Sequence, residues 1–130
     1  SCTGQPNYQR LEFVGDRVLG AIIAQRLYRE YPGFREGELA IRFNELVRRE
    51  TLAGIVRRLG LDRFIRLSPG EEENGGRQKP AILADCGEAV IGALFLDGGF
   101  EAAHAFVERH WQELVAGVAV KDKDAKTLLQ

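Results

Sequence analysis

Two pairs of carboxylate side chains stand inside stretches that are otherwise apolar. Glu12 and Asp16 are four residues apart in "RLEFVGDRVLGAII" (10–23), and Asp85 and Glu88 are three apart in "AILADCGEAVIGALFLDGG" (81–99). In a helix, residues three or four apart share a face. Taking an unpaired carboxylate out of water costs several kcal/mol, so these side chains need a partner in such surroundings.

If the two pairs meet across a helical bundle, they form a group of carboxylates that we call the acidic cluster: Glu12, Asp16, Asp85 and Glu88. Such a cluster holds either protons, at shifted pKa values, or cations. Oxygen ligands without paired histidines favour a hard ion, Mg²⁺ or Mn²⁺. The alternative is two solvated helix faces, with Arg10 or Arg17 as an ordinary ion-pair partner of the first pair.

Helical spacing of apolar residues runs through most of the chain and predicts an all-α fold. Thr51 is a good N-cap for a helix that ends at Gly60, although nothing between Glu50 and Leu52 excludes one continuous helix there. Turn-forming residues predict loops over 1–7 and 67–80. The expected helices span about 10–30, 36–50, 51–60, 81–99 and 100–118.

Glycines interrupt the apolar helices at Gly15, Gly87 and Gly92. A glycine inside a helix costs about 1 kcal/mol relative to alanine, so each of these positions calls for a reason. Close packing of two helices is one such reason, and close approach of a ligand is the other. The spacing alone leaves both open.

The composition describes one globular domain of 130 residues with a net charge of −1. That charge argues weakly against a nucleic-acid partner, but a bound divalent cation changes the balance locally. No apolar run is long enough to span a bilayer. Cys2 and Cys86 are too few for a disulfide framework and indicate a reducing compartment. The two cysteines do not have the spacing of a zinc site. The two histidines, His104 and His110, are six residues apart and do not have it either.

Three long stretches resemble the ribonuclease III family. "NYQRLEFVGDRVL" (7–19) resembles the family signature, and 36–53 and 67–99 resemble its second and third characteristic blocks. The resemblance covers about residues 7–115 and is to the bacterial class with one nuclease domain. It implies a helical bundle that forms a homodimer. Residues 1–119 would be the catalytic domain without its first helix, and 120–130 a linker and the start of a truncated double-stranded-RNA-binding domain.

The resemblance also implies roles for individual residues. The whole acidic cluster would bind metal, with Asp16 and Glu88 catalytic, and Glu36 would have a secondary catalytic or substrate role. Phe13 would lie at the dimer interface, with plain core packing as the alternative. Gln9 stands where the family often has glutamate. From their positions in the chain, and not from the resemblance, several residues are candidates for contacts with the RNA backbone, with ordinary surface charge as the alternative: Asn44, Arg48, Arg49, Arg77 and Lys79.

The implied activity is Mg²⁺-dependent hydrolysis of double-stranded RNA, with Mn²⁺ as a substitute ion. Products would carry 5′-phosphate and 3′-hydroxyl ends with short 3′ overhangs, in rRNA and mRNA processing in the cytoplasm. The partners would be double-stranded RNA and a second copy of the chain, without a membrane. Three alternatives remain open: a non-catalytic RNA-binding module, a structural helical dimer and a DNA-directed metal nuclease. A fragment without its first helix and RNA-binding domain is expected to cleave slowly or only at low salt.

Overall fold

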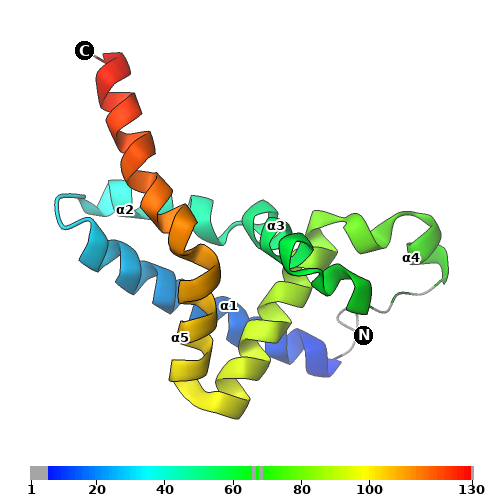
Figure 1. Cartoon of the computed structure of the whole chain (residues 1–130). Helices are drawn as coiled ribbons and strands as arrows, with labels where there is room; N and C mark the ends of the chain where they lie inside the picture. The colour runs from blue at the N-terminus through cyan, green and yellow to red at the C-terminus, as the bar shows by residue number, and fades with distance from the viewer. Residues whose placement is uncertain (1–5, 66, 68, 130) are drawn as a thin grey trace.

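The computed structural model describes residues 6–65, 67 and 69–129, with the backbone alone at 6, 71 and 120–129. Every regular element in these residues is helical, which confirms the all-α prediction. Figure 1 shows α1 lying across α5, which folds back on itself. The elements are α1 (Pro6–Glu30), α2 (Glu36–Val47), α3 (Arg49–Leu59), a 3₁₀ turn (Leu61–Phe64), α4 (Pro69–Glu73), a second 3₁₀ turn (Gly76–Gln78) and α5 (Pro80–Leu129).

The two ends of the chain differ from the expected boundaries. α1 already includes residues 6 and 7 of the expected loop, while 1–5, with Cys2, lie outside the described residues. None of the described helices is both long and apolar enough to cross a membrane. The helix expected to stop at Val118 runs on to Leu129, so that boundary was wrong. No glycine or proline between 119 and 129 interrupts it. The domain boundary at 119–120 stays a prediction.

A sharp turn at Gly99 divides α5 into a first half (80–98) and a second half (100–129). Gly99 has φ 77° and ψ −175°, which are non-helical values. A residue with a Cβ atom rarely adopts a positive φ, so glycine suits this position. The expected helix boundary at Gly98–Gly99 is confirmed. The turn lets the first half of α5 cross α1 and α3 while the second half packs along the rest of α1.

The break between α2 and α3 falls at Arg48, whose ψ of 161° is extended. The Thr51 hydroxyl lies inside α3 and donates to the Glu45 carbonyl at 2.7 Å. The Trp111 indole N–H donates to the Leu46 carbonyl at 2.9 Å. Both side chains thus satisfy carbonyls that the end of α2 leaves without a helical partner. Thr51 is therefore not the N-cap that the sequence suggested.

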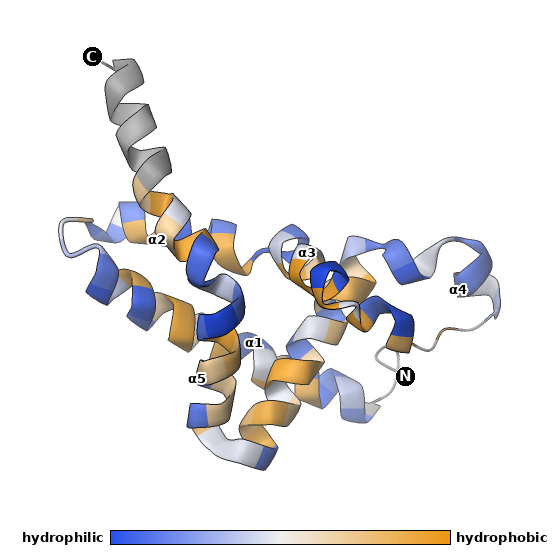
Figure 2. Ribbon diagram, in the orientation of Figure 1, coloured by the Kyte–Doolittle hydropathy of each residue, from blue (hydrophilic) through white to orange (hydrophobic). Residues whose placement is uncertain are grey.

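The segment expected to be a loop, 67–80, is partly helical because it contains α4 and the second 3₁₀ turn. Proline suits the first position of a helix, where α4 has Pro69. Gly75, at φ 71°, precedes the 3₁₀ turn. Gly60 ends α3 in the left-handed conformation, as predicted. This segment joins α3 to α5 and is mostly hydrophilic, as the blue of α4 shows in Figure 2.

Two hydrophobic clusters make up the core. The larger one joins α1, the end of α2, α3 and both halves of α5 around fully buried side chains such as Leu19, Ile22 and Trp111. The smaller one lies between α3 and the first half of α5 and includes Val56, Ile65 and Leu83. Burial of such side chains contributes about 1.5–3 kcal/mol each. The core therefore fixes the positions of α1, α3 and α5 relative to one another.

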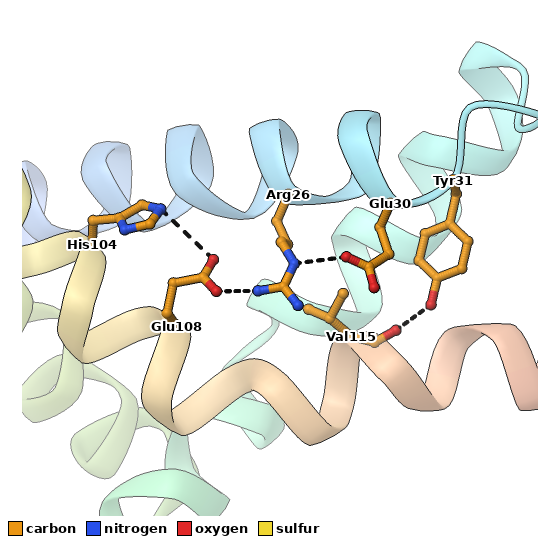
Figure 3. A network of polar contacts seen from close by, with 6 residues as sticks. All are labelled: Arg26, Glu30, Tyr31, His104, Glu108 and Val115. Carbon is orange, nitrogen blue, oxygen red and sulfur yellow. Dashed lines mark hydrogen bonds and ion pairs between the residues drawn. The ribbon is translucent and has the colours of Figure 1, made fainter.

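A polar network fastens the end of α1 to the second half of α5 (Figure 3). Arg26 binds Glu30 at 2.9 Å and also Glu108, which lies 3.7 Å from His104. The Tyr31 hydroxyl donates to the Val115 carbonyl. Partly exposed ion pairs add about 0–1 kcal/mol each, so this network orients the helices more than it stabilises them.

Candidate active site

The crossing of α1 and α5 brings two backbones into direct contact. A Cβ atom added to Gly15 would lie 1.7 Å from the Glu88 carbonyl oxygen, and one added to Gly92 would lie 2.2 Å from the Leu11 carbonyl oxygen. A Cβ on Gly87 would lie 3.0 Å from the Leu52 side chain of α3. Close helix packing is therefore the reason for all three glycines.

The same crossing assembles the acidic cluster. Gly15 lies between Glu12 and Asp16 on α1, and it touches the backbone of Glu88 itself. Asp16 is exposed, whereas Glu12, Asp85 and Glu88 are half-buried. One carboxylate oxygen of Glu12 is fully shielded from solvent. The apolar helices thus hold three of the four acids where water only partly reaches them.

The pKa of Glu88 reflects the presence of the other three acids. Burial raises the pKa of Glu88 to about 8, together with a hydrogen bond to Asp16 and the negative charges of Asp16, Asp85 and Glu12. Burial also raises the pKa of Asp85, and the positive charge of Arg49 partly opposes that shift. A carboxyl group that keeps its proton near neutral pH marks a place where a cation would relieve repulsion.

The acidic cluster fits a hard divalent cation in its donor atoms and charge. Carboxylate oxygens are the ligands that Mg²⁺ prefers. Within the described residues, however, no three acidic, histidine or cysteine side chains are arranged as a ready set of metal ligands. Asp16 and Glu88 instead form a hydrogen bond with each other.

Glu36 lies away from the acidic cluster. It is exposed at the start of α2 and lines an apolar hollow of about 400 Å³ with Ala24 and Tyr28. Ala24 follows Glu12 by twelve residues, or about 18 Å along α1. The structure therefore does not bring Glu36 to the four acids within one chain.

Arg77 is engaged within the chain. Its guanidinium binds the Glu72 carboxylate at 2.8 Å and 3.1 Å, and it donates to the Asp62 and Ile65 carbonyls. These bonds tie α4 and both 3₁₀ turns together. They weigh against the prediction that Arg77 contacts RNA. Other predicted RNA contacts are exposed: Asn44, Arg48, Arg49 and Lys79.

Phe13 stands on the outer side of α1, with 62% of its surface exposed. Its exposure excludes the alternative of plain core packing. It borders a shallow hollow of about 910 Å³, whose lining includes Gln9 and Leu96, and Leu96 is also 62% exposed. The sequence interpretation missed Leu96, although it stands among the apolar residues that end the first half of α5.

Known proteins resemble this chain in sequence over most of its length. A family model described as Ribonuclease-III-like matches residues 2–114. The chain is 49% identical over 124 residues to a protein named Ribonuclease 3 from Azorhizobium caulinodans, covering 95% of this chain and 53% of that one. It is also 49% identical to a Ribonuclease 3 from Cereibacter sphaeroides, covering 100% of this chain and 57% of the relative. The chain thus spans about half the length of these curated relatives.

Solved structures show the same similarity. The nuclease domain of ribonuclease III from Campylobacter jejuni superposes with a TM-score of 0.76 at 40% identity, over 80% of this chain and 71% of that chain. A second structure of that domain, described for structural flexibility in its region involved in dimer formation, gives a TM-score of 0.74 at 39% identity, over 79% of this chain and 75% of that one.

Proposed function

The chain belongs to the ribonuclease III family, and from that premise we propose that it is the catalytic part of an endonuclease that hydrolyses double-stranded RNA. The observation that carries the proposal is the acidic cluster at the crossing of α1 and α5. The finer expectations belong to the same proposal: 5′-phosphate and 3′-hydroxyl ends with short 3′ overhangs, rRNA and mRNA processing, and a cytoplasmic location.

The acidic cluster would hold Mg²⁺, with Mn²⁺ as a substitute. A divalent ion supplies charge for the attacking and leaving oxygens of a phosphodiester and a readily ionised water. The protein contributes the placement of the ligands. Asp16 and Glu88 form a hydrogen bond with each other, and Asp16 is exposed to solvent, so a substrate could reach it. We assign the catalytic roles to these two residues. Glu36 would have a secondary catalytic or substrate role, away from the acidic cluster of its own chain.

Recognition of the RNA would depend on phosphates and shape, because the narrow major groove of A-form RNA cannot be read by side chains. Exposed Asn44, Arg48 and Lys79 are our candidates for backbone contacts, while Arg77 mainly orders its own segment. The acidic cluster repels phosphate unless a cation neutralises it. RNA binding at this site is therefore expected to require the metal ion.

A homodimer would place two such sites on one RNA duplex, one for each strand. The exposed Phe13 and the hollow beside it are the proposed contact surface. We expect Phe13→Ala to weaken dimerisation about tenfold or more, because exposed aromatic anchors dominate such interfaces. Sedimentation equilibrium measures the change in dimer dissociation constant.

The matched control for Phe13→Ala is Phe64→Ala, since Phe64 is 66% exposed on a different element. The thermal midpoint of the Phe13 variant should fall little, as its ring lies outside the core. An unchanged dissociation constant for Phe13→Ala would rule out this surface as the dimer contact.

A cleavage assay on three substrates separates this function from its rivals. With Mg²⁺ at low salt, the protein is expected to cut a long RNA duplex, but neither a DNA duplex nor single-stranded RNA of the same sequence. Retention of the RNA duplex without cutting would favour a binding module. Cutting of the DNA duplex would favour a DNA-directed nuclease. Neither cutting nor binding of any of the three substrates would favour a structural dimer.

A further inference from the structure

A polar cavity lies outside the acidic cluster, between the last turn of α3 and the second half of α5. Its volume of about 530 Å³ falls in the range of small-ligand sites, about 300–1,000 Å³. None of the four acids is among the described residues that line it. The lining consists of Arg58, Arg109, His110, Gln112, Glu113 and Ala116. Two arginines and a histidine in one cavity point to an anionic ligand.

The two helices contribute to this cavity in different ways. Gln112 and Ala116 come three and seven residues after Arg109, so these three residues share one face of α5. Arg58 reaches the cavity from α3, and its guanidinium donates to the backbone carbonyl of His110 at 3.1 Å. That bond fixes the guanidinium beside the cavity and leaves most of its N–H groups for a ligand.

The cavity carries an excess of positive charge. Arg58 and Arg109 contribute two cations, whereas Glu113 is the one carboxylate among the described lining residues. The side chain of Arg109 is exposed and has neither an ion pair nor a hydrogen bond with any side chain that the structure describes. Burial lowers the pKa of His110, and the positive charges of Arg109 and Arg58 lower it further. A concave site with one sign of charge concentrates ions of the opposite sign.

We propose that this cavity binds a phosphate group, held by the guanidinium groups of Arg58 and Arg109 next to His110. A guanidinium forms two parallel hydrogen bonds with a phosphate, so two of them can surround the anion. The negative charge also offsets the repulsion between the two arginines. The site is separate from the acidic cluster, and the inference does not rest on the proposed function.

The titration of His110 reports on the bound anion. A negative charge beside an imidazole favours its protonated form, so phosphate should raise the pKa of His110. The charged groups that line the cavity with it are Arg58 from α3 and Arg109 and Glu113 from its own helix. By linkage, phosphate should bind more tightly as the pH falls and His110 takes up its proton.

Proton NMR of the histidine rings tests the proposal directly, because the chain has two histidines. The protein is titrated with inorganic phosphate in EDTA, so that no metal ion can hold phosphate at the acidic cluster, and with sodium chloride of equal ionic strength. The His110 signal should respond to phosphate with a dissociation constant on the order of 1 mM, and not to chloride. The signal of His104, which lies outside the cavity 3.7 Å from Glu108, should not respond.

Arg109→Gln should raise the dissociation constant for phosphate about tenfold or more, since hydrogen bonds to charged groups are the strong ones. Its side chain has no partner among the described residues, so the fold should be unaffected. Arg58→Gln should weaken phosphate binding similarly. Arg29→Gln is the matched control, because Arg29 is exposed on α1 and lies outside the cavity. This variant carries the same charge change and should bind phosphate like the unmodified chain.

A short RNA duplex, added in EDTA at low salt, identifies the source of the phosphate. A response of His110 that Arg109→Gln abolishes would assign the cavity to a phosphate of the RNA backbone. A response to inorganic phosphate alone would assign it to small phosphorylated molecules. Either result supports a phosphate site. The proposal is overturned if inorganic phosphate leaves the pKa of His110 unchanged, or if Arg109→Gln and Arg29→Gln weaken binding equally, as general loss of positive charge would.

Discussion

Replacing Gly15 by alanine is expected to lower the free energy of unfolding by about 3 kcal/mol or more, since overpacking commonly costs 1–3 kcal/mol and this clash is with backbone. The new Cβ atom would lie 1.7 Å from the Glu88 carbonyl oxygen. Neither atom belongs to a flexible side chain, so α1 and α5 must move apart. The acidic cluster spans the two helices, and its assembly should be lost with the crossing. Urea unfolding followed by circular dichroism measures the change.

Gly54→Ala is the control for this substitution. Gly54 lies in α3, is exposed, and has no atom within 4 Å of the position of a new Cβ. Alanine there should stabilise the protein by about 0.5–1 kcal/mol through helix propensity alone. If Gly15→Ala proved as stable as the unmodified chain, the direct contact between α1 and α5 would be incorrect.

The second large effect is a gain in stability from Glu88→Gln in the absence of metal. The pKa of Glu88 is raised by burial and by its acidic neighbours, to about 8. Between its unfolded pKa near 4.5 and about pH 8, the folded state therefore binds more protons than the unfolded state, and stability falls as the pH rises. Glutamine does not ionise, so the Glu88→Gln variant avoids this loss of stability. At pH 8 the gain should be about 1–2 kcal/mol, because water screens part of the repulsion at a half-exposed group.

Thermal unfolding in EDTA at pH 5 and pH 8 tests this prediction. The advantage of Glu88→Gln over the unmodified chain should be small at pH 5 and several degrees at pH 8. Glu101→Gln, an exposed position on the same helix, should show no such trend. A stability loss for Glu88→Gln at pH 8 would mean that the carboxylate is stabilised by its surroundings rather than repelled by them.

Much of the fold could be predicted because its signals are local. Proline and glycine at 32 and 33, Gly60 and Gly99 mark helix ends, and the observed ends agree with them. The break between α2 and α3 could not be predicted in the same way. Its carbonyls are satisfied by Thr51 and, from a distant helix, by Trp111. A side chain that caps from another element leaves no mark in the local sequence.

In the candidate site, too, some features follow from the local sequence and others depend on contacts between distant segments. The spacing of the four acids and the nearby glycines left open whether two helices meet there or a ligand approaches closely, and the contact at Gly15 shows that the helices meet. The surroundings of individual site residues could not be predicted, because they depend on tertiary contacts. Arg77 looked like an RNA ligand from its place in a glycine-rich segment, but its guanidinium binds Glu72 and two carbonyls. Glu36 belongs to a matching block of sequence, yet α2 places it beside the far half of α1.

The most direct test is the rate of cleavage of a long RNA duplex by the unmodified chain and by Glu88→Gln, at low salt with Mg²⁺ or EDTA, with Glu101→Gln as the control. The account predicts cutting with Mg²⁺ by the unmodified chain and by Glu101→Gln, none in EDTA, and a rate for Glu88→Gln that is lower by a factor of about 10² or more. Cutting that persists in EDTA, or a Glu88→Gln variant as fast as the unmodified chain, would contradict it.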